Sequence, residues 1–165
     1  MISEDRVSVT SHIDVDPGTA FDVFTREVDL WWKRGPRYRV GGMRESVMRF
    51  EAGVGGRFLE VYDEATDEHF EIGRVLVWEP ASRLVFRWRG RSFEPGQTTE
   101  VDVRFEAVEA GTRIVLEHRG FEGLPADHPV RHGLEGPAFT QMIGLWWADL
   151  LVSVRAHGAG RSGPA

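Results

Sequence analysis

The feature that most limits the fold is a series of short apolar segments, separated by turn residues, between positions 44 and 119. Their β-branched and aromatic residues predict strands. In the last two segments apolar and polar residues alternate, which indicates one buried face and one solvated face. Short connections between consecutive strands predict an antiparallel meander. The expected strands lie at about 44–51, 55–63, 68–79, 83–90, 98–108 and 111–119.

One further strand and three helices complete the predicted order. Residues 5–15 alternate and predict a strand, after which Asp16 and Pro17 are typical of a helix start. A second short helix is expected around residues 28–32. The longest helical segment runs from about Leu134 to His157, and a rise of about 1.5 Å per residue makes it long enough to cross a whole sheet.

The glycines of Gly53-Val54-Gly55-Gly56 do not form a phosphate-binding loop. The stretch lacks the Lys-Ser/Thr pair of such a loop and does not open a helix. A turn or bulge is the better interpretation. We expect these glycines to bend the sheet so that the long helix can lie across it.

Length and composition limit the class of protein. The 165 residues suffice for one domain with a sizeable core, expected over residues 1–157 with a flexible tail at 158–165. A net charge of −6 argues against a general binder of nucleic acids or anionic membranes. The chain has no cysteine, which excludes disulfides and thiolate sites. Because no signal peptide or membrane span is recognisable, a cytoplasmic protein is expected. No pattern indicates a cofactor.

Several local stretches resemble a known superfamily. The segments VGGRFLEVYDE, GRVLVWEPASRLVFRW, TRIVLEHRGFEGL and GLWWADLL look like the SRPBCC superfamily, and within it the homologues of the heat-shock protein 90 ATPase activator C-terminal domain. The resemblance covers roughly residues 5–157. It implies an α+β START-like helix-grip fold, in which a curved antiparallel sheet of about seven strands wraps around a long C-terminal helix. Such a fold does not fix function, because the superfamily includes ligand binders, aromatase/cyclases, stress-related proteins and co-chaperone modules.

Large apolar side chains are the expected lining of an internal cavity, since small-molecule sites have apolar walls with few polar anchors. The alternative is a solid core without a useful void. Adjacent tryptophans on a helix lie about 100° apart, so one of each pair is expected at an edge. The candidates are Trp31, Trp32, Phe58, Phe86, Trp88, Phe139, Met142, Trp146 and Trp147.

Two ionisable residues are further candidates for the cavity. His118 shares a face with Ile114 and Leu116, so it is expected to point inward, either toward a ligand or as a satisfied histidine at a strand end. Glu60 has the same parity as Phe58, and a carboxylate inside would have a raised pKa. Leu59 and Val61 are equally apolar with the opposite parity, so the inward face of this strand stays open.

Metal-dependent and nucleophilic chemistry have little support. His128 and His132 are four residues apart, but Pro129 and Gly133 predict a loop and no third ligand is spaced to match. No nucleophile-elbow pattern occurs. We therefore assign no catalytic residue and no metal site.

Three functions remain open. The first is non-enzymatic binding of a small hydrophobic or aromatic ligand. The second is a chaperone-regulator-like interaction module, with a docking face formed by Lys33, Arg34, Arg37 and Arg39 beside Trp31 and Trp32. The third is a cyclase or hydrolase for a polyketide-like aromatic compound, assisted by His118, Glu60 or Arg104. A homodimer is plausible because edge strands and exposed tryptophans often find partners.

Overall fold

The computed structural model describes residues 6–161 and has the predicted order of elements. A strand is followed by two short helices, six strands and one long helix. Arg26 and Glu27 separate the two short helices. The elements are β1 (Arg6–Ile13), α1 (Pro17–Thr25), α2 (Val28–Trp31), β2 (Val47–Phe50), β3 (Arg57–Asp63), β4 (Glu68–Glu79), β5 (Arg83–Trp88), β6 (Thr99–Val108), β7 (Gly111–Arg119), two 3₁₀ turns (Phe121–Gly123 and Pro129–Arg131) and α3 (Gly136–Arg161).

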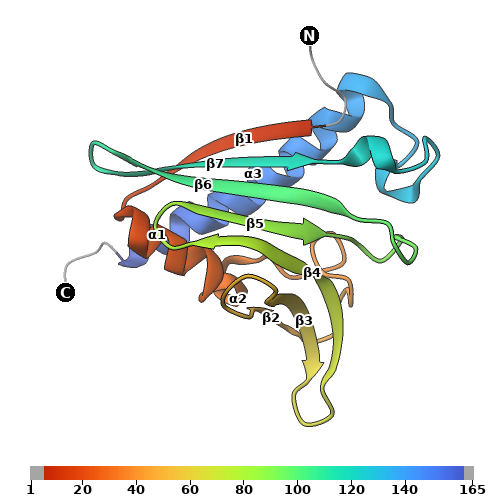
Figure 1. Cartoon of the computed structure of the whole chain (residues 1–165), viewed down its shortest axis with the longest axis horizontal. Helices are drawn as coiled ribbons and strands as arrows, with labels where there is room; N and C mark the ends of the chain where they lie inside the picture. The colour runs from red at the N-terminus through yellow and green to blue at the C-terminus, as the bar shows by residue number, and fades with distance from the viewer. Residues whose placement is uncertain (1–5, 162–165) are drawn as a thin grey trace.

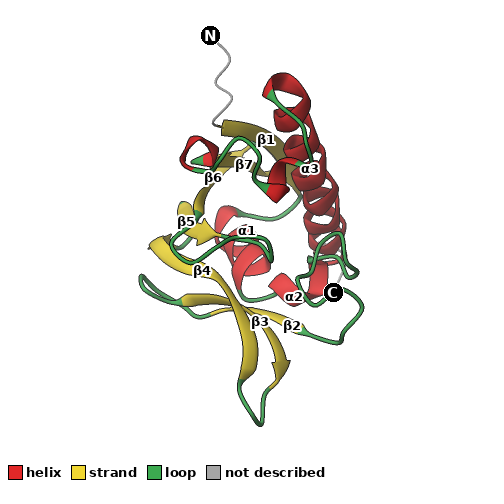
Figure 2. Cartoon of the chain, turned by 90° about the vertical axis from the view of Figure 1, so that its right-hand side faces the viewer, coloured by secondary structure: helices red, strands yellow, loops and turns green. Residues whose placement is uncertain are grey.

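All seven strands form one curved sheet in the order β1-β7-β6-β5-β4-β3-β2, and every neighbouring pair is antiparallel. Helix α3 runs along the β1 side of this sheet, and α1 and α2 lie within its concave side (Figures 1 and 2). This arrangement is the helix-grip fold. None of the helices in residues 6–161 combines the length and hydropathy needed to cross a membrane.

Aromatic rings fill most of the space between the sheet and the helices. Phe21 of α1 packs against Phe105 of β6 with ring centroids 5.3 Å apart. Phe58 of β3 meets Phe86 of β5 at 5.4 Å. Each such ring removes a large apolar area from water, so these contacts dominate the stability of the core.

The glycine-rich stretch makes a turn, as predicted, and an irregularity in the strand pairing lies beside Gly73 of β4. Gly53 and Gly55 have φ angles of +90° and +84° and make the turn between β2 and β3. The strand register shifts beside Gly73, between Phe58 and Leu59 of the partner strand. A Cβ on Gly73 would lie 1.6 Å from the carbonyl oxygen of Arg87. Only glycine therefore allows the backbones to approach so closely at this point of the sheet.

Helix α3 extends beyond the predicted end at His157. Residues 158–161 belong to the helix and not to a tail, while residues 162–165 lie outside the described part of the chain. Gly158 is buried, and a Cβ there would lie 2.3 Å from Cγ1 of Ile13. The glycine thus lets the last turns of α3 pack directly on the end of β1, a tertiary contact that overrides its low helix propensity.

We predict that Gly73→Ala lowers the free energy of unfolding by about 3 kcal/mol, because the added methyl group overlaps a backbone oxygen that cannot move freely. Urea denaturation followed by circular dichroism measures the change. Gly123→Ala is the control, since a Cβ there meets nothing within 4 Å, and it should change stability by less than about 0.5 kcal/mol. Equal stability of the two variants would contradict the role of Gly73.

Candidate functional site

A cavity of about 810 Å³ opens at the end of the sheet where β5 and β7 terminate, on the right in Figure 1. Its walls come from α3, from Trp88 at the end of β5, from His118 of β7 and from three loops. The lining residues are Pro36, Arg37, Tyr38, Arg39, Val40, Trp88, Gly90, Arg91, Ser92, Phe93, His118, Pro129, Val130, His132, Met142, Ile143 and Trp146.

The structure brings four of the predicted site residues together in this lining: Trp88, His118, Met142 and Trp146. The others lie outside it. Glu60 is buried beside a loop, and the remaining five side chains fill the core as in the solid-core alternative: Trp31, Phe58, Phe86, Phe139 and Trp147. Trp32 is buried as well, and its ring contacts Phe58 at 5.5 Å. This cavity therefore opens at the end of the sheet, while the other predicted lining residues pack in the core.

Loops contribute lining residues that sequence patterns do not reveal. Phe93 follows β5 in a turn, and its ring contacts Trp88 at 5.5 Å. Val130 belongs to a short 3₁₀ turn that also lines the cavity. Neither residue belongs to a periodic segment, so no alternation rule could assign it a face. The glycines and prolines near these two residues in the sequence predict only that each lies in a loop.

His118 is the centre of a buried hydrogen-bond chain that links α3 to three strands. Nε1–H of Trp147 donates to Nδ1 of His118 at 3.0 Å. Because Nδ1 accepts, the neutral ring carries its proton on Nε2, which donates to Oγ1 of Thr99 at 2.7 Å. The Thr99 hydroxyl in turn donates to the carbonyl oxygen of Trp88 at 2.9 Å.

The same burial removes His118 from acid–base chemistry near neutral pH. The side chain is 1% exposed, and burial lowers the pKa of His118 to about 3. Its two nitrogens already have partners, so neither is free to bind a ligand proton. The alternation of residues in the sequence correctly predicted that His118 points inward. Of the two interpretations, its contacts support that of a hydrogen-bonded histidine at a strand end.

Glu60 faces the core side of β3 but holds a loop instead of lining the cavity. Met48 and Phe50 of β2 pair with Glu60 and Phe58, and the Phe50 and Phe58 rings stack at 4.0 Å. Alternation therefore places Leu59 on the opposite face, which settles the open question of parity. The Glu60 carboxylate accepts hydrogen bonds from the loop backbone and a neighbouring phenol: Val40 N–H at 2.8 Å, Gly41 N–H at 2.7 Å and Tyr62 O–H.

The loop over residues 33–41 is thereby fixed as one wall of the cavity. Nε1–H of Trp146 donates to the carbonyl oxygen of Arg37 at 2.8 Å. Nε1–H of Trp32 donates to that of Tyr38 at 3.0 Å. The Tyr38 hydroxyl donates to Asp149 of α3, and this bond, together with Lys33, lowers the pKa of Asp149. These contacts make the wall largely pre-formed.

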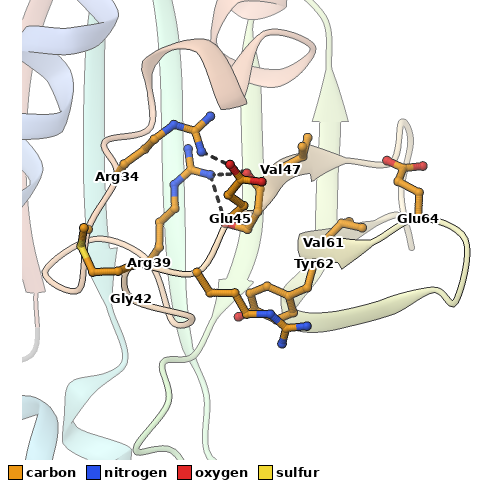
Figure 3. Close-up of a pocket in the computed structure, with 12 residues that line it drawn as sticks. Arg34, Arg39, Gly42, Glu45, Val47, Val61, Tyr62 and Glu64 are labelled. Carbon is orange, nitrogen blue, oxygen red and sulfur yellow. Dashed lines mark hydrogen bonds between the residues drawn. The ribbon is translucent and has the colours of Figure 1, made fainter.

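The basic cluster expected to form a docking face is mostly engaged within the chain. The Arg39 side chain is 1% exposed and bonds Asp29 at 3.0 Å. Arg34 donates to the carbonyl oxygen of Ser46 at 3.1 Å. Figure 3 shows these two guanidinium groups together at a second depression of about 500 Å³, over β2 and β3. Both guanidinium groups pair with the same carboxylate, that of Asp29, so part of the positive charge of the expected docking face is offset within the chain.

The remaining candidates do not assemble into a catalytic or metal site. Arg104 is exposed and lies 4.0 Å from Asp102, whereas His118 and Glu60 are both buried. The three do not converge on one position. His128 bonds Gln97 at 2.9 Å, and His132 is exposed in a left-handed conformation. Across residues 6–161 no three His, Asp or Glu side chains are arranged to hold a metal ion.

Comparisons with known proteins agree with this architecture. Residues 14–143 match the model of the family described as "Activator of Hsp90 ATPase homolog 1-like protein". Protein MLL2253 from Mesorhizobium loti is 16% identical, with 96% of this chain and 99% of that chain covered and a TM-score of 0.64. The Aha1 dimer from Colwellia psychrerythraea is 17% identical, with 94% of each chain covered and a TM-score of 0.59.

DynU16, from the dynemicin biosynthetic locus, is 16% identical with a TM-score of 0.62, but the 94% of this chain that aligns spans only 47% of DynU16. At such identities the likeness shows the fold alone. No curated protein matches the sequence.

We predict that His118 makes stability fall with acid. Its pKa is about 3 in the folded protein and 6.5 in the unfolded chain, so the unfolded chain binds the proton first. The stabilisation is complete above pH 6.5 and is lost by about 1.4 kcal/mol per pH unit below it. Between pH 7.5 and 5 the wild type should lose roughly 2 kcal/mol more than His118→Gln. Parallel stability profiles in urea denaturation would contradict this assignment.

Proposed function

The chain belongs to the family of activator of Hsp90 ATPase homolog 1-like proteins, and within that fold we propose that it binds a small apolar or aromatic molecule without chemical conversion. The observation that carries the proposal is the aromatic-walled cavity of about 810 Å³. Small-molecule sites typically enclose about 300–1,000 Å³ and are largely apolar.

The shape of the walls supports a flat ligand. The ring of Trp146 stacks on Tyr38 with centroids 5.8 Å apart and an interplanar angle of 30°. Trp88 stands nearly edge-on to Trp146 at 6.1 Å. Offset and edge-to-face contacts are the favoured geometries for aromatic groups. A planar ligand between these rings and Met142 would gain such contacts on both sides.

The state of the polar groups supports binding without catalysis. His118 contacts the cavity only through a ring whose nitrogens are both bonded. A general base needs a free lone pair and a pKa near the working pH. His118 has neither, and Glu60 lies behind the loop wall. The cyclase or hydrolase alternative therefore loses the residues that were expected to carry it.

Interaction with other proteins stays a prediction. β1 and β2 are the two edge strands of the sheet, and Val47 of β2 is 44% exposed, so an edge is available for a homodimer. The Colwellia relative is described as a dimer. For the chaperone-regulator alternative, the internal pairing of Arg34 and Arg39 weakens the expected docking face.

We predict that blocking the cavity weakens binding. Wild-type protein is titrated by calorimetry with a panel of polycyclic aromatic and acyl compounds. Met142→Trp fills the cavity from α3 and should weaken binding of any hit at least tenfold, or about 1.4 kcal/mol. Leu145→Trp is the control, because Leu145 is 59% exposed on the same helix and does not line the cavity. It should bind like the wild type.

Two results would count against the proposal. The first is that no compound of the panel binds the wild type. The second is that both tryptophan variants bind equally well, since a ligand unaffected by Met142→Trp must lie elsewhere.

A further inference from the structure

The charge of the cavity differs from that of the whole protein. The chain carries a net charge of −6, yet the lining contains Arg37, Arg39 and Arg91 and no aspartate or glutamate. Acidic residues outnumber basic ones in the sequence, 26 to 20. A purely apolar ligand does not account for a lining whose charged residues are all positive. The sign of this charge therefore indicates the charge of the ligand.

Arg37 and Arg91 are the two cations available at the rim. The Arg39 charge is offset by Asp29 at 3.0 Å. Within residues 6–161 no carboxylate lies within 4.0 Å of Arg37 or Arg91, whereas most of the other described arginines have one, as Arg57 does in Glu51 at 2.7 Å.

The surroundings position both arginines without neutralising them. Arg91 donates to the carbonyl oxygen of Val40, and the Arg37 guanidinium lies 5.6 Å from the centre of the Tyr38 ring. Arg37 acts on Asp149 only at longer range, and Asp149 already has Lys33 at 3.4 Å. Because a guanidinium has five N–H donors, each arginine keeps donors for a further acceptor.

We propose, on the basis of the binding function above, that the ligand is an aromatic or acyl carboxylic acid bound as its anion. Its apolar body lies against Trp88, Met142 and Trp146, and its carboxylate meets Arg37 and Arg91 at the rim. A planar carboxylate matches the fork of a guanidinium and accepts two parallel hydrogen bonds from it. In this arrangement the apolar walls supply most of the affinity, and the two arginines select the charged head group.

Both arginines are exposed, so the preference they give is moderate and sensitive to salt. We expect a carboxylate to bind about tenfold more tightly than a neutral ligand with the same body, which corresponds to about 1.4 kcal/mol. Raising the salt concentration to about 1 M, where the screening length is about 3 Å, should reduce this ratio severalfold.

The test compares 1-pyrenebutyric acid with 1-pyrenebutanamide, which share their apolar body and differ in charge. Affinities are measured by pyrene fluorescence for wild type, for Arg37→Gln/Arg91→Gln and for the control Arg87→Gln/Arg155→Gln. The control removes the same charge from two exposed arginines outside the cavity. We expect the rim variant to lose the preference for the acid while binding the amide as the wild type does, and the control to keep the preference.

The failures are distinguishable. Equal affinity of the wild type for acid and amide overturns the carboxylate proposal and leaves the cavity function standing. Loss of the preference in the control variant also overturns it, because the effect would then follow net charge. If neither the acid nor the amide binds the wild type, both proposals are overturned.

Discussion

The hydrogen-bond chain from Trp147 through His118 and Thr99 to Trp88 is the constraint on which the rest of the site depends. It ties α3 to β7, β6 and β5 at one level of the fold, with every donor and acceptor matched. Burying these polar groups would be costly if one partner were missing, so the chain fixes how the helix lies on the sheet. On one side of this chain aromatic rings fill the core. On the other side, where β5 and β7 end, the cavity opens.

A second set of polar contacts determines the other wall. The Glu60 carboxylate holds the backbone at Val40 and Gly41, while Trp146 holds it at Arg37. The loop would otherwise be free to collapse into the space or to move away from it. With its backbone bonded from both the sheet and α3, the loop presents Tyr38 and Arg37 at a fixed distance from the helix, which reduces the ordering cost of binding.

The sequence predicted the framework well because the framework is periodic. Alternation in residues 98–119 located β6 and β7, and parity correctly turned His118 inward. Position along the fold was harder to predict. Trp88 and Phe86 share a face of β5, yet only Trp88, at the strand end, reaches the void. Arg91 and Phe93 come from a loop, where no period applies. Gly158 was predicted to belong to a tail because the contact that holds it in the helix is with Ile13, far away in the sequence, and no local pattern reveals such a contact.

The central proposal is that a ligand binds in the cavity at the end of the sheet and not in the core. The most direct measurement is the titration of 1-pyrenebutyric acid into ¹⁵N-labelled protein while the indole N–H resonances of the tryptophans are followed. The account predicts that the signals of Trp88 and Trp146 shift, whereas that of Trp31, which is 3% exposed and donates to the carbonyl oxygen of Val23 in the core, stays in place. A large shift of Trp31 with unchanged Trp88 and Trp146 would place the ligand in the core and contradict the claim.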